Sequence, residues 1–455
     1  MSTVVLINPP IPGKKPSLKI PSLGIAYLAS TLRNQGISIK IIDAPSLNLD
    51  TEAVSQEVLI LKPEIIGITA TTPLSNSADQ LASNLRKHAK WLILGGPHPS
   101  AVGNKIFEEC PDLDFGFRGE AEEVFPELVK KLLAGEKNFE MPGVIWPGHS
   151  AEPALIPELD HIPQPAFDLL PMKSYRHPLS PGQRVATMIT SRGCPFQCIF
   201  CDKSICGTRF RPRSPDNVLS EIEELYHNFG VRVIIFYDDL FTLDPERVLE
   251  ICQQILARGI KIKWKCEGRV NILSENILGV MRRAGCEVIA FGIESCHQKT
   301  LDWLNKGTSV EQIKEAVRLT KQAGIKVLGY FIFGIPIESY EEELASIEFA
   351  IQLELDYVQF GSLSPFPGTK LYDLAIEKGW YQQAKGPAPE EYGERRPLII
   401  TDYWTEERLT QILKQAYRRF YFRPKYILGS ALRPRGILDL AKSGLRLTGW
   451  LTRLE

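Results

Sequence analysis

The chain has 455 residues, of which 44% are hydrophobic and 24% charged, a composition typical of a soluble globular protein of about three domains. Its 53 basic and 54 acidic residues give a net charge of −1, and this balance argues against a nucleic-acid partner. No apolar run reaches the roughly 18 residues of a membrane span, and the N-terminus lacks the features of a signal peptide. The nine cysteines show no disulfide framework, so we expect a cytoplasmic protein whose cysteines are free, metal-bound or catalytic.

Residues 1–135 alternate short apolar strands with helical stretches such as Leu23–Asn34. This alternation predicts an α/β fold with a parallel, doubly wound, Rossmann-like sheet. Five strands are expected: Val4–Ile7, Ile37–Asp43, Ile65–Thr72, Trp91–Leu94 and Asp114–Phe117. Ligands of such sheets lie beyond the carboxyl ends of the strands. Here those ends carry small or turn-forming residues, which suit close approach of a bulky ligand to the backbone: Asn8, Thr69, Gly95, Gly96, Gly119 and Glu120.

Residues 136–184 are rich in proline, which fits neither helix interiors nor central strands and therefore predicts a connector. Residues 185–385 return to alternating strands and helices. This second pattern predicts a partial, TIM-like (β/α)6 barrel, with its chemistry at the carboxyl ends of the strands. Six strands are expected: Arg184–Thr190, Val231–Tyr237, Lys261–Cys266, Val288–Ile293, Val327–Phe333 and Val358–Leu363.

Residues 386–455 are predicted to form a helical C-terminal extension, with one helix over Thr405–Phe422. The final stretch, Arg435–Leu454, is amphipathic, with apolar side chains on one side and arginine and lysine on the other. Two interpretations stay open: the stretch lies on a membrane surface with Trp450 at the boundary, or it packs its apolar face on the barrel. The excess of basic residues favours peripheral contact with the inner face of a membrane.

Three cysteines at offsets of four and three, Cys194, Cys198 and Cys201, follow the first strand of the predicted barrel. Thiolates suit iron–sulfur clusters or zinc. A four-iron cluster has four ligand positions, so three cysteines leave one iron open for an external ligand. Zinc sites built on cysteine usually pair two CxxC arms, and no second arm is evident, although Cys206 or another scattered cysteine is an alternative ligand.

This motif, with Phe200 directly before the last cysteine, resembles the cysteine loop of the radical S-adenosylmethionine superfamily. The resemblance implies a [4Fe–4S] cluster whose open iron is chelated by the amino and carboxylate groups of S-adenosylmethionine. One electron from the cluster then cleaves this cofactor to a 5′-deoxyadenosyl radical. An electron donor such as ferredoxin or flavodoxin is implied as well.

The same resemblance assigns cofactor contacts at the ends of later strands. Asp238 is expected to meet the amino group of S-adenosylmethionine, Glu294 to lie near its ribose and methionine, and Gly334 with Pro336 to flank its adenine. Arg269 is expected to pair with the methionine carboxylate. The alternative for Asp238 is a helix cap, and for Gly334–Pro336 it is a turn.

A doubly wound domain before such a barrel resembles the cobalamin-binding branch of the superfamily. The segments that carry the likeness are Asn8-Pro9-Pro10, Gly95-Gly96-Pro97-His98 and Arg118-Gly119-Glu120. They imply cobalamin contacts from Asn8, Pro9, Thr69, Gly95, Gly96 and Glu120. The Asp-x-His-x-x-Gly motif of other cobalamin proteins is missing after the first strand, so no histidine from it ligates the lower face. His98 is expected to be a loop residue instead.

The leading functional hypothesis is therefore a cobalamin-dependent radical methyltransferase that acts on an unactivated carbon. Basic, apolar C-terminal tails also occur in relatives acting on hopanoids, other isoprenoid lipids and porphyrins, which suggests a lipid-like or other small-molecule substrate. Two alternatives remain open. One is radical cyclisation, ring contraction or carbon–carbon coupling without methyl transfer, and the other is a non-enzymatic cobalamin or redox sensor.

Overall fold

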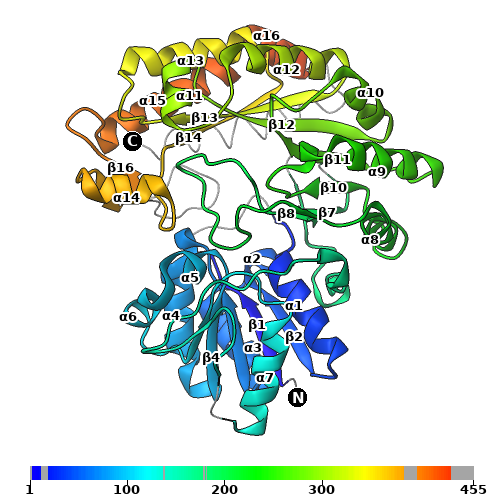
Figure 1. Ribbon diagram of the computed structural model, residues 1–455, viewed down its shortest axis with the longest axis vertical. Coiled ribbons are helices and arrows are strands. Elements are labelled where there is room, and N and C mark those ends of the chain that lie inside the picture. The colour runs from blue at the N-terminus through cyan, green and yellow to red at the C-terminus, as the bar shows by residue number, and fades with distance from the viewer. Residues whose placement is uncertain are drawn as a thin grey trace.

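The computed structural model describes residues 3–11, 19–136, 139–177, 180, 182–383 and 397–431. Two six-stranded sheets dominate it (Figure 1). We call β1–β6 with their helices the N-terminal module, and β7–β14 with theirs the barrel. Figure 1 shows the N-terminal module in blue and cyan below the barrel, with β8 at the junction between them.

The N-terminal sheet has the strand order β2-β1-β3-β4-β5-β6. Its parallel strands are β1 (Val4–Asn8), β2 (Ile39–Asp43), β3 (Ile65–Thr69), β4 (Trp91–Gly95) and β5 (Phe115–Phe117). A short sixth strand, β6 (Val144–Ile145), pairs antiparallel with β5 and was not expected. Its two residues lie between Pro142 and Pro147, where a strand signal is too short to detect.

Helices cover both faces of this sheet, as a doubly wound fold requires. Alternate residues of β1 enter different cores: Val4 and Leu6 pack with α1 (Leu23–Asn34) and α7 (Val124–Ala134), whereas Val5 and Ile7 pack with α3 (Thr51–Leu61) and α4 (Ser75–Leu85). Burial on both faces explains why the strands are uninterrupted apolar runs. The predicted doubly wound sheet is confirmed.

The barrel sheet is entirely parallel, in the order β14-β13-β12-β11-β10-β7. Its strands are β7 (Val185–Met188), β10 (Val233–Phe236), β11 (Lys263–Gly268), β12 (Cys286–Glu294), β13 (Lys326–Phe333) and β14 (Tyr357–Ser362). Strands that follow one another in the chain are neighbours, apart from the small hairpin described next. This order confirms the predicted partial (β/α)6 barrel.

Helices between these strands begin at polar caps. Ser214 caps α8 (Pro215–His227) and Asp244 caps α9 (Pro245–Ala257). Full capping boxes start α12 (Val310–Gln322) and α13 (Tyr340–Gln352), so each first turn has its free amide groups satisfied. The remaining helices of the barrel are α10 (Glu275–Arg283), α11 (Gln298–Trp303) and α14 (Lys370–Glu377).

A hairpin encloses the cysteine loop. β8 (Ser191–Arg192) pairs antiparallel with β9 (Arg211–Pro212), and Arg192 stands opposite Arg211. Residues 193–210 therefore form one loop whose two ends are held together. The sequence analysis did not predict this hairpin, because two-residue strands have no periodicity.

The C-terminal extension packs on the outer edge of the barrel. Helix α15 (Glu406–Tyr421) lies against β14, where the Tyr421 hydroxyl donates to Val358 O (2.6 Å) and accepts from Val358 N (3.0 Å). Tyr417 bonds Phe360 in the same way. Two tyrosines thus occupy backbone groups of an edge strand that would otherwise be open for pairing.

A short antiparallel pair, β15 (Tyr381–Gln383) with β16 (Pro397–Ile399), precedes α15 in the chain, and α16 (Pro424–Ala431) follows it. The amphipathic stretch predicted over Arg435–Leu454 lies outside the described residues. Within the described part of the chain, no helix has the length and apolarity needed to cross a membrane.

Candidate active site at the junction of the two sheets

The three predicted metal-binding cysteines share the loop between β8 and β9. Cys194 and Cys198 are half-buried, and Cys201 is more exposed. Desolvation raises the pKa of the Cys194 thiol, and Asp239 and Cys198 raise it further. The atoms packed around Cys201 likewise raise its pKa to about 12, with contributions from Asp239, Cys194 and Cys198. The three sulfurs are therefore close enough to influence one another.

Backbone contacts fix the shape of this loop. Gly193 has a φ of +83°, and a Cβ there would lie 2.1 Å from Arg209 O, so glycine is required. Ile199 N donates to Leu304 O (3.1 Å) and Ile199 O accepts from Leu371 N (2.9 Å). Phe200 packs with Leu304 in a small apolar cluster next to the loop. The loop thus depends on the barrel for its conformation.

The donor set fits an iron–sulfur cluster. Among the described residues, no three histidine, cysteine or acidic side chains converge on a point that one metal ion would fill. A cubane instead spreads its cysteine ligands over separate irons. Cys206, considered as a further ligand, is influenced mainly by burial, Arg192 and Asp239, and its backbone carbonyl accepts from Arg211 (2.7 Å). It therefore lies on the side of the loop that carries the arginines.

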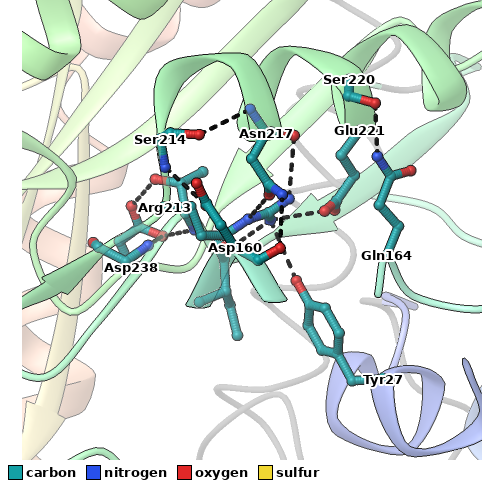
Figure 2. A network of polar contacts seen from close by, with 12 residues as sticks. Tyr27, Asp160, Gln164, Arg213, Ser214, Asn217, Ser220, Glu221 and Asp238 are labelled. Carbon is teal, nitrogen blue, oxygen red and sulfur yellow. Dashed lines mark hydrogen bonds and ion pairs between the residues drawn. The ribbon is translucent and has the colours of Figure 1, made fainter. Parts of the chain in front are cut away.

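Asp238 lies elsewhere than expected. Its carboxylate is buried and accepts hydrogen bonds from Thr190 N (2.5 Å), Thr190 Oγ1 (2.5 Å) and Ser191 N (3.2 Å), which ties β10 to β7. Figure 2 shows it in a buried polar network with Arg213. These donors give Asp238 a structural part in joining β10 to β7, and its expected contact with the amino group of S-adenosylmethionine stays a prediction.

The neighbouring Asp239 is the acid that faces the cysteine loop. It is exposed, it raises the pKa of both Cys194 and Cys201, and the amide of Gly193 lowers its own pKa against a larger rise from desolvation. Successive residues at a strand end point to opposite sides. The sequence pointed to this strand end but could not tell which of the two adjacent aspartates faces the cysteine loop.

Glu294 lies at the end of β12 in a buried ion pair with Lys306, 2.6 Å from Oε1 to Nζ. Its φ is +66° and follows a register shift between Gly292 and Glu294. A Cβ on Gly292 would lie 2.3 Å from Glu294 Oε1 and 2.5 Å from Lys306 Nζ. The glycine is therefore explained by this pair, and a strained non-glycine residue of this kind is common at functional sites.

Arg269 organises the same region. Its guanidinium donates to Lys306 O, to Gly307 O (3.3 Å) and to Asn271 Oδ1 (3.0 Å), and it stacks 3.6 Å from the ring centre of Phe196 in the cysteine loop. These contacts join the end of β11 to the cysteine loop. Pairing with a methionine carboxylate stays a prediction for this residue.

The Gly334–Pro336 turn is held from behind by an acid that sequence reasoning missed. Gly334 N (2.6 Å) and Ile335 N (2.9 Å) both donate to Glu343 Oε1 of α13. A Cβ on Gly334 would lie 2.3 Å from Leu409 Cδ2. Burial raises the pKa of Glu343 to about 9, so this carboxyl is largely protonated at neutral pH.

A second missed group lies in mid-barrel. Lys265 Nζ is 2.6 Å from Glu267 Oε1 and 3.2 Å from the hydroxyl of Tyr330, which also bonds Glu267 (3.2 Å). Trp264 and Cys266, which alternate with these residues on β11, are in the core behind the sheet, so the triad projects from the other face. The sequence signal for this group was the alternation of the charged Lys265 and Glu267 with apolar residues along β11.

In the N-terminal module, Asn8, Thr69, Gly95 and Gly96 lie together at the carboxyl edge of the sheet, as predicted, whereas Pro9 is buried. Gly96 has a φ of +101°, and a Cβ there would lie 2.8 Å from Thr69 Oγ1. Asn8 donates to Asp43 Oδ1 (2.9 Å). Small side chains thus leave the backbone of this edge accessible, which fits a bulky ligand.

His98 is buried, and both of its ring nitrogens are engaged. Nε2 lies 2.8 Å from Glu109 Oε2 and Nδ1 lies 3.3 Å from Thr72 Oγ1. The structure places it in the short helix α5 (Pro97–Val102), so the expected loop position is wrong, because the helix begins directly after the turn at Gly96. Glu120, in contrast, does not face the open edge: its carboxylate is buried and paired with Arg211. Two arginine nitrogens and an amide already occupy its oxygens, and the expected cobalamin contact from Glu120 stays a prediction.

Comparison with known proteins agrees with this geometry. Residues 188–350 match the radical SAM superfamily and residues 11–129 match the B12 binding domain. The chain is 35% identical over 430 residues to an uncharacterized methyltransferase of Pyrococcus horikoshii, covering 92% of this chain and 91% of that protein. It is 30% identical to the anaerobic magnesium-protoporphyrin IX monomethyl ester cyclase of Cereibacter sphaeroides, covering 93% and 74%.

Among solved structures, the radical S-adenosylmethionine methyltransferase TsrM from Kitasatospora setae, with cobalamin and a [4Fe-4S] cluster bound, superimposes with a TM-score of 0.74. Identity is 18%, over 93% of this chain and 90% of that one, so this likeness supports the fold. Together with the two family matches and the 35% identical relative, it leads to one conclusion: the chain belongs to the radical SAM superfamily, in the branch with an N-terminal B12-binding domain.

Proposed function

We propose that this protein is a cobalamin-dependent radical S-adenosylmethionine methyltransferase acting on a small molecule. The observation that carries the proposal is the meeting of the cysteine loop with the N-terminal module. A Cβ on Gly368, in the loop after β14, would lie 3.1 Å from Asp202 Oδ1 of the cysteine loop and 3.3 Å from Ala101 Cβ of the N-terminal helix α5 (Pro97–Val102). Two cofactors held on these elements would face a common space.

The proposal divides the chain as the sequence suggests. Residues 1–135 hold cobalamin, 136–184 connect, 185–385 carry the cluster, and 386–455 form the C-terminal extension. When bound, the cluster supplies the electron that cleaves S-adenosylmethionine to a 5′-deoxyadenosyl radical, and cobalamin supplies the methyl group. Holding both cofactors and the substrate in line is a proximity effect.

The chain's own residues have distinct tasks in this scheme. Cys194, Cys198 and Cys201 ligate the cluster, and Asp239, next to them, binds the ammonium of S-adenosylmethionine. The Glu294–Lys306 ion pair, which carries no net charge, offers one hydrogen-bond acceptor and one donor to the ribose and methionine of S-adenosylmethionine. At the N-terminal edge, Thr69 and Gly95 leave room for the corrin ring.

For the substrate we propose a lipid-like or isoprenoid molecule that also carries a hydrogen-bonding group. Phe422 and Leu428, near the end of the described chain, are 42% and 64% exposed and lead towards the basic amphipathic stretch, which supports contact with a membrane surface. Lys265, Glu267 and Tyr330 would receive the polar group of the substrate. A ferredoxin or flavodoxin is proposed as the electron donor, and a cytoplasmic location at the inner membrane face follows.

Radical cyclisation without methyl transfer is the second candidate, favoured by the 30% identical cyclase. Anaerobic reconstitution with iron, sulfide and aquacobalamin, followed by incubation with S-adenosylmethionine, reductant and a lipid extract, separates the two. Methyl transfer yields S-adenosylhomocysteine together with 5′-deoxyadenosine. Deoxyadenosine alone indicates cyclisation or coupling, and failure to cleave the cofactor would support a non-enzymatic sensor.

A further inference from the structure

Two buried acids of the N-terminal module meet two arginines at the ends of the cysteine loop. Glu120 and Glu122 follow β5, at the carboxyl edge of the N-terminal sheet, and Arg192 and Arg211 are the facing residues of β8 and β9. All four side chains are buried. We call these four residues the junction clamp.

The clamp has the geometry of strong, directional ion pairs. Arg211 binds Glu120 with both terminal nitrogens, at 2.6 and 2.7 Å. Arg192 lies 2.5 Å from Glu122 Oε1 and 3.6 Å from Glu120 Oε1. A bidentate guanidinium–carboxylate pair fixes orientation as well as distance. The four charges sum to zero, so the cluster of charges is tolerated in a buried position.

The same arginines hold the cysteine loop. Arg192 directly precedes Gly193 and Cys194 in the chain. Arg211 Nη2, while bound to Glu120, also donates to Cys206 O (2.7 Å) inside the loop. The N-terminal module therefore binds the cysteine loop at both of its ends. At the first end, Arg192 lies two residues before Cys194.

Local backbone geometry is arranged to bring Glu120 to this place. Gly119 has a φ of +81°, and a Cβ there would lie 2.2 Å from Ala154 O, so only glycine fits. Glu120 also accepts from Ile156 N (2.7 Å). The Arg118-Gly119-Glu120 segment, which sequence analysis assigned to cobalamin, is thus explained by the junction.

A third contact strengthens the junction. Tyr27 of α1 lies 5.4 Å below the Arg192 guanidinium and its hydroxyl accepts from Arg213 Nη1 (3.4 Å). Figure 2 shows Tyr27 reaching from its helix towards Arg213 and Glu221. Arg213 is itself paired with Glu221 at 2.7 Å, but both of these residues belong to the barrel.

From these contacts we infer that Glu120 and Glu122 are positioning residues: they set the place of the cysteine loop relative to the cobalamin edge of the N-terminal module. Only one part of this inference rests on the proposed function, namely that the clamp also sets the position of the cluster relative to cobalamin. The mechanical link itself is a property of the chain without cofactors. Breaking it should therefore loosen the loop before any chemistry is considered.

The direct test is hydrogen exchange on the full chain, free of cluster and cobalamin, comparing wild type with Glu120→Gln/Glu122→Gln. The control is Asp114→Asn, which breaks the partly buried Arg86–Asp114 ion pair (2.6 Å) within the N-terminal module and touches neither the clamp nor Tyr27. We expect amides of residues 193–210 to exchange about tenfold faster in the clamp variant, since buried pairs are costly to break, and to stay near wild type in Asp114→Asn. Unchanged exchange in the clamp variant, or equal acceleration in both, would overturn the inference.

A second measurement uses the reconstituted enzyme. If the clamp positions the loop, Glu120→Gln/Glu122→Gln keeps its iron content and still forms 5′-deoxyadenosine, but releases several-fold more of it per S-adenosylhomocysteine than Asp114→Asn does. An unchanged ratio with faster loop exchange would refute the positioning role while leaving the link intact. Absence of S-adenosylhomocysteine in wild type would instead count against the proposed methyl transfer, and the exchange result would still stand.

Discussion

The carboxyl ends of the two sheets are built from different kinds of residue. At the N-terminal edge, Thr69, Gly95 and Gly96 are small, and nearby polar groups such as His98 are satisfied inside the module. At the barrel edge, Asp238 and Glu294 are charged and buried. A buried charge is costly unless it is paired or hydrogen-bonded, so each has a partner from another strand or loop. The ends of β3 and β4 are shaped for a large ligand, whereas the barrel edge, like Glu120 and Glu122 after β5, is organised by charge.

The cysteine loop lies at the charged barrel edge, and removing one of its three cysteines gives the largest expected effect on activity. Cys198→Ala removes one of the three proposed cluster ligands, so cleavage of S-adenosylmethionine should fall below detection and the iron–sulfur absorbance should weaken. Cys296→Ala, which changes a half-buried cysteine outside the loop, is the control and should keep both. Activity in Cys198→Ala with full iron content would show that another residue is the ligand.

Breaking a pair at the barrel edge tests whether charge organises it. Lys306→Met leaves Glu294 buried without its cation, and we expect a loss of about 3 kcal/mol in the free energy of unfolding measured with urea. Adding Glu294→Gln to that variant should restore much of the loss, because no lone charge remains. Lys299→Met removes an ion pair that is much more exposed and should change little. Equal losses for the two lysines would contradict the comparison.

Most of the fold was predictable because its signals are repeated. Apolar strands at regular spacing identified both sheets. The proline-rich connector over residues 136–184 stays a prediction, and β6 within it pairs with β5 of the N-terminal sheet. The exceptions were the short strands β6, β8, β9, β15 and β16, which arise from tertiary contact. Two residues such as Ser191–Arg192 carry no periodic pattern, so their pairing depends on where the rest of the chain places them.

The site was predictable to the level of strand ends, but not to the level of free side chains. Sequence identified the Gly292–Ser295 and Gly334–Pro336 elements by their glycines, of which Gly334 has a positive φ and Gly292 leaves room for the Glu294–Lys306 pair. It could not show that Asp238 is saturated by Thr190, or that Glu120 joins two modules. Those outcomes depend on residues distant in sequence, 48 and 91 positions away.

The two adjacent aspartates offer a sharper test of the charged edge. Asp239→Asn should weaken binding of S-adenosylmethionine to the cluster-loaded protein about tenfold, because a charge-assisted hydrogen bond is lost, with an unchanged melting temperature. Asp238→Asn should do the opposite: affinity stays near wild type, while the melting temperature falls by several degrees, about 2–4 °C per kcal/mol. Calorimetric titration and thermal melts measure the two effects. A shared loss of affinity would return Asp238 to the cofactor site.

The smallest expected effect concerns Glu343, a buried acid at the barrel edge whose hydrogen-bond partners are backbone amides instead of a cation. Glu343 supports the Gly334–Pro336 turn, yet its Oε2 has no hydrogen-bond partner among the described residues. Burial raises its pKa from an ordinary value of 4.5 to about 9, Glu338 raises it as well, and the amides of Ile335 and Gly334 lower it. Because the folded chain holds a proton that the unfolded chain releases above pH 4.5, this group's contribution to stability is complete at low pH and is lost as pH rises towards 9.

Glu343→Gln keeps a carbonyl oxygen for the two amides and cannot ionise, so it should remove that part of the pH dependence. Between pH 6 and pH 9 the melting temperature of wild type should fall at least about 2 °C further than that of the variant. Glu341→Gln, in the same first turn but exposed, is the matched control and should follow wild type. If Glu343→Gln also follows wild type, the carboxyl is already ionised in the folded protein. An ionised carboxylate in this buried position would need a cation outside the described residues to balance it. Glu343 would then be paired, as Glu294 is with Lys306 at the same edge.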